Sequence, residues 1–160
     1  MTYEIKSIIE LEELINNREY IDNLTIDVNE DINHLLCNLT HLTFLKFGNY
    51  YNQLTNLTFF VNLQYLEFKY EYNQLTDLSN LVNLTYLKFG DDYNQLTDLS
   101  NLVNLIHLEF GSNSFFGICN YYNQPTDLTQ CKKLETLNNS NIEELDLSKY
   151  RKGIFKKKLK

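Results

Sequence analysis

The chain has 160 residues, a formal net charge of −7 and only three cysteines. Leucine occurs 28 times and asparagine 22 times, whereas alanine and tryptophan are absent and proline occurs once. This composition disfavours a helical bundle, a collagen and a proline-rich linker. The 43% hydrophobic content disfavours a disordered chain. No apolar run approaches the ~20 residues of a membrane-spanning helix, so we expect no such span.

The N-terminal stretch and the cysteines both bear on the cellular compartment. Acidic residues interrupt residues 1–14, where a secretory signal would be continuously apolar. Cys37, Cys119 and Cys131 are odd in number and lack the paired spacing of a disulfide scaffold. We therefore expect a reduced intracellular protein that is not secreted, located in the cytoplasm, or in the nucleus if the basic C-terminal tail serves as an address.

The charge is strongly segregated along the chain. Residues 149–160 contain seven lysines or arginines and no acidic residue, while residues 1–148 contain all 21 acidic residues and seven basic ones. The body would repel nucleic acid and anionic lipid, so only the tail Lys149–Lys160 could attract an anionic partner.

An internal repeat dominates the sequence from residue 21 to residue 139. The pattern Leu-x-x-Leu-x-Phe recurs every 21 residues and begins at Leu42, Leu63, Leu84 and Leu105. Weaker copies begin at Ile21 and Leu134. The tripeptide Tyr-Asn-Gln recurs with spacings of 21, 21 and 29 residues and begins at Tyr51, Tyr72, Tyr93 and Tyr122. Eight extra residues therefore lie in the last interval, near residues 112–121.

Each repeat unit predicts a strand, a polar turn and a tight return. Leu87 and Phe89 stand two apart, which is typical of a strand with one buried face. After the turn, leucines at a spacing of three, including Leu96, favour 3₁₀-like turns. One unit cannot bury these side chains alone, so copies must stack and align their strands in a parallel sheet. We expect equivalent leucines to lie in line inside the core, namely Leu45, Leu66, Leu87 and Leu108.

The unit Leu-x-x-Leu-x-Phe followed by asparagine and leucine resembles the leucine-rich repeat. The stretch LTDLSNLVNLTYLKF is similar to the internalin-type version, and the FGxxYNQ segment is similar to the FNIP repeats of amoebae and their giant viruses. The resemblance implies an α/β solenoid, a right-handed superhelix with a parallel sheet on its concave face, short 3₁₀ or loop returns and a helical N-terminal cap. It says almost nothing about the ligand.

Three segments follow from these patterns. Residues 1–20 form an N-terminal cap, in which Ser7 and Glu10 make a capping box, 3–6 form a strand and 7–17 a helix. Residues 21–148 form an array of about six coils with an insertion near 112–121, and 149–160 form the basic tail. Residues 142–147 are either a further repeat strand or a cap.

Two columns of outward-facing strand residues are the candidate binding site. The first column is aromatic and consists of Phe44, Tyr65, Tyr86 and His107. The second alternates in charge and consists of Lys46, Glu67, Lys88 and Glu109. Exposed aromatic rows supply rigid contact area at interfaces. The alternative interpretation is structural, because rings can simply stack on each other and alternating signs avoid like neighbours.

Other patterns favour structure over chemistry. The asparagines of the Tyr-Asn-Gln turns are expected to form a ladder that satisfies backbone groups between coils. His34, Cys37 and His41 have the spacing of metal ligands but lack a fourth ligand, so we expect no metal and no cofactor. No G-x-S-x-G motif, P-loop or dinucleotide-binding fingerprint is present in the sequence.

The sequence therefore predicts a non-catalytic protein–protein interaction module that binds an unknown protein partner on the concave sheet face. The alternative is an electrostatic anchor, in which the tail Lys149–Lys160 binds nucleic acid or an anionic membrane. We expect the protein not to be an enzyme. This predicted function depends on the family resemblance and on the lack of a recognisable chemical motif in the sequence.

Overall fold

The structure is a computed structural model that describes residues 2–17, 20–113, 120–122, 124 and 126–138. The predicted segment 142–147, the basic tail and the middle of the insertion lie outside the described residues. The helices and strands, in chain order, are β1 (Thr2–Ile5), α1 (Ile8–Asn16), β2 (Asn23–Ile26), α2 (Asn33–Leu36), β3 (Phe44–Phe47), β4 (Tyr65–Glu67), β5 (Tyr86–Phe89), β6 (His107–Phe110), β7 (Ser112–Asn113), β8 (Asn120–Tyr121) and β9 (Thr136–Asn138).

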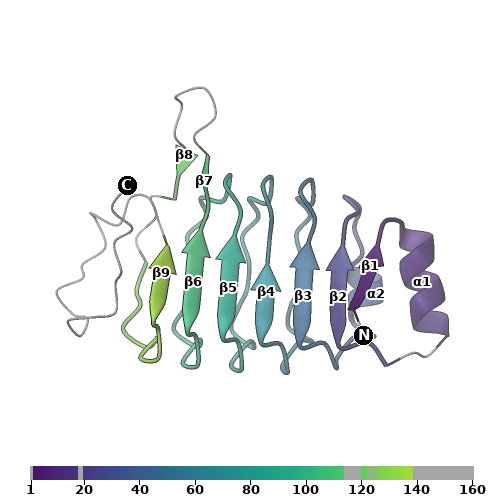
Figure 1. Cartoon of the computed structure of the whole chain (residues 1–160), viewed down its shortest axis with the longest axis horizontal. Helices are drawn as coiled ribbons and strands as arrows, with labels where there is room; N and C mark the ends of the chain where they lie inside the picture. Colours follow the sequence, from purple (N-terminus) through teal and green to yellow (C-terminus); the bar gives the residue numbers. More distant parts are fainter. Residues whose placement is uncertain (1, 18–19, 114–119, 123, 125, 139–160) are drawn as a thin grey trace.

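Seven strands form one parallel sheet in the order β1-β2-β3-β4-β5-β6-β9 (Figure 1). Each strand lies beside the next long strand in the chain, and β1 and β9 are the edges of the sheet. The short strands β7 and β8 form a separate antiparallel pair within the insertion. An open, all-parallel sheet with few helices is compatible with a solenoid-like repeat fold.

The register of the sheet follows the 21-residue period. Leu45 pairs with Leu66, Leu66 with Leu87, and Leu87 with Leu108. All four leucines are fully buried. The predicted line of leucines inside the core is therefore confirmed, because a strict period places each residue beside its own equivalent in the next strand.

The return segments are built from the predicted tight turns. The amide of Leu81 donates to the carbonyl of Leu78, and the amide of Leu84 donates to the carbonyl of Leu81. These bonds join residues three apart, as in a 3₁₀ helix. The first return keeps the same bonds, from Leu39 to Leu36 and from Leu42 to Leu39, and the short helix α2 precedes them. The sequence pattern did not predict this helix.

The expectation that Leu96 begins the buried return is wrong. Leu96 is 59% exposed, and its equivalents Leu54 and Leu75 are 63% and 62% exposed. The neighbouring Thr97 is buried instead, because its hydroxyl bonds to the buried phenol of Tyr93 at 2.6 Å. Exposed and buried residues alternate along 96–99, so burying the threonine leaves the leucine outward.

The tyrosines of the Tyr-Asn-Gln turns lie inside the core, although the sequence placed them in a polar turn. The ring of Tyr72 stacks on Phe68 with centroids 3.7 Å apart, and its hydroxyl lies 2.8 Å from that of Thr76. The hydroxyl bond satisfies the one polar atom that burial removes from water. Burial raises the pKa to about 12 for Tyr51, Tyr72 and Tyr93.

The predicted asparagine ladder is confirmed. Oδ1 of Asn52 accepts the amide N–H of Asn73 at 3.0 Å, and Oδ1 of Asn73 accepts that of Asn94 at 2.9 Å. Each side chain therefore satisfies a turn amide of the next coil. Gln95 adds a second bond, from its Nε2 to Oδ1 of Asn73.

The N-terminal cap closes one end of the sheet (Figure 1). Oγ of Ser7 accepts the amide N–H of Glu10 at 3.3 Å, which confirms that Ser7 caps α1. The cap also supplies the edge strand β1, which pairs with β2. Within the part of the chain that the structure describes, no helix combines the length and apolar character needed to cross a bilayer.

Candidate functional site

The aromatic column forms a continuous stack across β3, β4, β5 and β6. Ring centroids lie 4.3 Å apart between Phe44 and Tyr65, 4.3 Å between Tyr65 and Tyr86, and 4.4 Å between Tyr86 and His107. The rings are within 12° of parallel. All four side chains are half-buried, because each strand alternates a buried residue with an outward one. The stack fixes the orientation of each ring against its neighbours.

The residues of the charged column, next to the rings, form two ion pairs. Nζ of Lys46 lies 3.0 Å from Oε2 of Glu67, and Nζ of Lys88 lies 2.8 Å from Oε1 of Glu109. The sequence predicted neighbouring opposite charges, and the pairing is confirmed. Glu67 is however only 7% exposed, so this pair is less accessible to water than the expected surface pair.

The two columns are joined by hydrogen bonds along the strands. The Tyr65 hydroxyl donates to Oε2 of Glu67 at 2.6 Å, and Nε2 of His107 lies 3.4 Å from Oε2 of Glu109. Burial and the bond to Glu67 raise the pKa of Tyr65 above its usual range. Burial and the charge of Glu109 do the same for the pKa of Tyr86. The sequence did not predict these contacts, although the spacing of two residues on one strand face was available as a signal.

Lys88 and Glu109 stabilise each other's charged form. Partial burial alone would lower the pKa of Lys88, but the hydrogen bond and charge of Glu109 outweigh it and raise that pKa. Burial would likewise raise the pKa of Glu109, yet Lys88 holds it below the usual range. The pair is therefore ionised near neutral pH and presents one positive and one negative group beside the rings.

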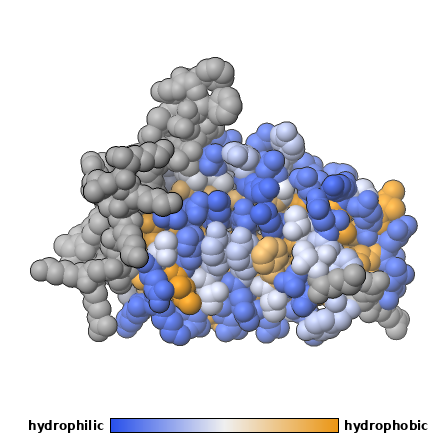
Figure 2. Space-filling model, in the orientation of Figure 1, coloured by the Kyte–Doolittle hydropathy of each residue, from blue (hydrophilic) through white to orange (hydrophobic). Residues whose placement is uncertain are grey.

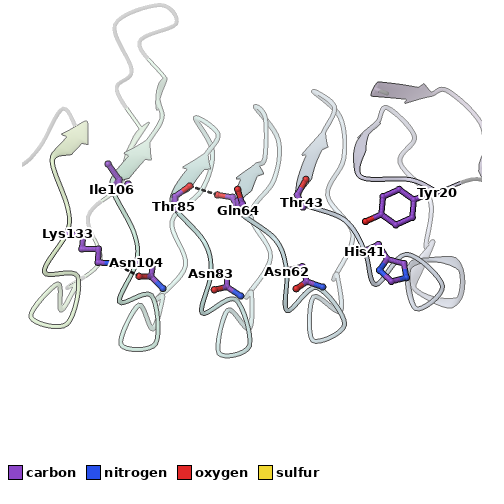
Figure 3. Close-up of a pocket in the computed structure, with 10 residues that line it drawn as sticks. All are labelled: Tyr20, His41, Thr43, Asn62, Gln64, Asn83, Thr85, Asn104, Ile106 and Lys133. Atoms are coloured by element: carbon purple, nitrogen blue, oxygen red, sulfur yellow. Dashed lines mark hydrogen bonds between the residues drawn. The ribbon is translucent and has the colours of Figure 1, made fainter.

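A polar groove of about 800 Å³ runs across the coils at the start of the strands (Figure 3). Asparagines from three successive coils form one row along it, and each Nδ2 donates to a carbonyl of the preceding coil. Lys133 reaches Oδ1 of Asn104 at 2.6 Å from one end of the groove. The lining residues are Tyr20, His41, Thr43, Asn62, Gln64, Asn83, Thr85, Asn104, Ile106 and Lys133.

The sheet face is mostly hydrophilic, with side chains of intermediate hydropathy over the middle strands (Figure 2). It combines the aromatic column, the paired charges and the polar groove on one surface. Such a surface offers ring edges and fixed polar groups but does not enclose a small molecule. This arrangement is better suited to contact with another macromolecule than to binding a small substrate.

The metal-like spacing of His34, Cys37 and His41 does not produce a cluster. His41 stacks against Tyr20 with centroids 5.3 Å apart, while the Cys37 thiol donates to the carbonyl of His34. Over the residues that the structure describes, no group of three or more His, Cys, Asp or Glu side chains is placed to hold a metal ion.

Comparison with known proteins gives no family. No protein-family model matches the chain, and no curated protein matches it.

Proposed function

We propose that this chain is a non-catalytic protein-interaction module that acts inside the cell and binds a protein partner on its sheet face. The anchors are the aromatic column, with the charged column beside it setting the partner's orientation. The observation that carries the proposal is the continuous stack of four half-buried rings from Phe44 to His107.

The physical argument is preorganisation. An interface loses affinity when its side chains must be ordered on binding, at about 0.5–1.5 kcal/mol for each flexible side chain. Rings already held by their neighbours avoid most of that loss. Aromatic side chains also dominate binding energy at protein interfaces. The Tyr65–Glu67 and Lys88–Glu109 contacts fix the neighbouring charges in the same way.

We further propose that the repeats belong to the leucine-rich-repeat class, with the internalin-like and FNIP-type features noted in the sequence. In that class the array is a right-handed superhelix, and the parallel sheet lines its concave face. The all-parallel register and the 21-residue period support this assignment.

Affinity capture from the cell of origin tests the proposed face. The wild-type chain is compared with a variant that carries both Tyr65→Ala and Tyr86→Ala. We expect the double variant to lose a partner that the wild type retains, with a loss of affinity of about tenfold or more. Direct titration of that isolated partner then measures the loss.

The matched control is the double variant Tyr50→Phe and Tyr70→Phe, which alters two exposed tyrosines away from the column. It should capture the same partner as the wild type. Urea denaturation must show that the column variant is still folded. If the folded column variant captures the partner as well as the wild type does, the proposed face is wrong and the ring stack serves the fold alone.

A second candidate is the electrostatic anchor, which the segregation of charge in the sequence favours. Residues 149–160 would bind nucleic acid or an anionic membrane while the array acts as a spacer. A truncation after Ser148 tests it. Salt-sensitive binding to anionic vesicles or to DNA that survives the truncation would exclude this function for the tail.

A further inference from the structure

Three equivalent leucines form an exposed strip on the segment that follows the Tyr-Asn-Gln turns, away from the ring and charge columns of the sheet face. Leu54, Leu75 and Leu96 are each about three-fifths exposed, although the other leucines of the same repeats are buried. Their positions are 21 residues apart, so they lie on successive coils at the strand spacing of about 4.8 Å. Their side chains therefore make a continuous apolar row of three coils.

The strip borders a groove of about 560 Å³. Its floor includes the buried side chains of Leu57 and Thr76, and its rim carries the carboxylates of Asp77 and Asp98. No lysine, arginine or histidine is among the described residues that line it. The groove is thus lined by exposed leucines from three coils and by carboxylates from two of them.

The two carboxylates are held in fixed positions. Oδ1 of Asp77 accepts the amide of Ser79 at 2.9 Å, and Oδ1 of Asp98 accepts that of Ser100 at 2.9 Å. These serine bonds lower the pKa of both aspartates, so both are ionised at neutral pH. Their side chains are exposed and can contact a cation on a bound partner.

The spacing of the strip selects the shape of the partner. Residues i, i+3 and i+7 of an α-helix rise by about 4.5 and 10.5 Å along its axis. In coils stacked about 4.8 Å apart, the second and third leucines lie about 4.8 and 9.6 Å from the first, which nearly matches these helix distances. Residues on one face of an extended strand are about 6.7 Å apart, so such a strand would not match the leucine of the third coil.

The acidic rim selects the charge of the partner. A second copy of this chain docked through the same strip would bring the Asp77 and Asp98 carboxylates of both copies together, which disfavours self-association. A partner with lysines or arginines beside its apolar row would pair with them. We infer that the Leu54–Leu75–Leu96 strip is a docking site for a basic amphipathic helix of another protein, with apolar residues at i, i+3 and i+7.

A synthetic helical peptide of about 14 residues, with leucines at i, i+3 and i+7 and flanking lysines, tests the site by fluorescence anisotropy with the full chain. We expect binding that weakens about tenfold or more in the double variant Leu75→Ser and Leu96→Ser. The control Val82→Ser and Val103→Ser alters two other exposed apolar residues and should leave the affinity unchanged.

The charge is tested separately with Asp77→Asn and Asp98→Asn. Asparagine keeps the turn bond, because Asn56 at the equivalent position already accepts the amide of Thr58 at 3.0 Å. We expect about a fivefold loss of affinity and a weaker dependence on salt. A peptide with glutamates in place of the lysines should bind at least about tenfold more weakly than the lysine peptide.

Four results would overturn the inference. The first is that the lysine peptide does not bind the full chain, and the second is that the serine variants bind it as tightly as the wild type. The third is binding only after truncation at Ser148, because the occupant would then be the chain's own residues 149–160. A concentration-dependent dimer that the leucine variants abolish would instead assign the strip to a second copy.

Discussion

The phenol of Tyr65 donates a hydrogen bond to Glu67, two residues along the same strand, with Oη and Oε2 2.6 Å apart. The same carboxylate oxygen receives the ammonium of Lys46 from the neighbouring strand at 3.0 Å. A nearly buried carboxylate is stable only when such partners replace the water it has lost. The Tyr65 ring therefore has two roles, one in the aromatic column and one in holding a charge.

Replacing Tyr65 by phenylalanine separates these roles. The ring remains stacked, as the natural phenylalanine at Phe44 shows, but Glu67 loses its phenolic donor. We expect the free energy of unfolding to fall by about 1–2 kcal/mol. Urea denaturation measures this change.

Tyr65→Ala provides the comparison, because it removes both the hydrogen bond and the stacking. It should cost about 1 kcal/mol more than Tyr65→Phe. Equal stability of the two variants would mean that stacking in the column contributes nothing.

The buried tyrosines predict a loss of stability at alkaline pH. Tyr51, Tyr72 and Tyr93 have folded pKa values of about 12, above the ordinary value of 10. The folded state thus holds these protons more tightly, so the stabilisation is complete below pH 10 and disappears as the pH rises through about 12. Each tyrosine should account for roughly 2–3 kcal/mol of the loss.

Urea midpoints measured across this pH range test the prediction. Tyr72→Phe should show a smaller decline than the wild type, whereas Tyr50→Phe, at an exposed tyrosine, should follow the wild type. A wild-type midpoint that is constant from pH 9 to pH 12 would contradict it.

The asparagine ladder predicts a specific order of stability at position 73. Asn73→Ala removes the oxygen that accepts the amide of Asn94 and Nε2 of Gln95, so we expect a loss of about 1–3 kcal/mol. Asn73→Asp keeps an acceptor oxygen and should cost less. Thermal or urea unfolding gives the order, and an alanine variant as stable as the aspartate variant would show that the ladder is not needed.

Gly90 occupies a place where the coils approach too closely for a side chain. A Cβ at this position would overlap the carbonyl group of Lys69 in the preceding coil. Backbone cannot move aside as a side chain can, so Gly90→Ala should cost about 1–3 kcal/mol.

Gly48→Ala is the matched comparison for this prediction. Its Cβ would overlap chiefly the exposed side chain of Asp27, which can rotate away. It should therefore cost less than Gly90→Ala in the same unfolding measurement. The reverse order would contradict the close approach at Gly90.

The sequence was sufficient to predict the sheet and its register. A fixed period of 21 residues leaves one way to align Leu45, Leu66 and Leu87, and the burial of one strand face follows from the alternation of residue types. The Ser7 cap was also predictable, because capping depends on residues three apart. The pairing of Lys46 with Glu67 followed from the same alignment.

The errors arose where a choice depended on packing between coils. Both Leu96 and Thr97 could face the core on polarity alone, and the bond of Thr97 to Tyr93 decides the orientation. The recurrence of threonine four residues after each tyrosine was a usable signal for that bond. Likewise, the spacing of Tyr65 and Glu67 places both side chains on one strand face, but the side-chain orientation that forms their bond is set by packing in the folded sheet.

The alignment of Tyr65 with Tyr86 has a consequence for how such a chain can change its length. Because each unit meets its neighbours through the same contacts, duplication of residues 64–84 would create no new kind of junction. One more ring, one more amide rung and one more outward leucine would extend the molecule by about 4.8 Å. The length of the array could thus change in fixed increments while its cross-section stays constant.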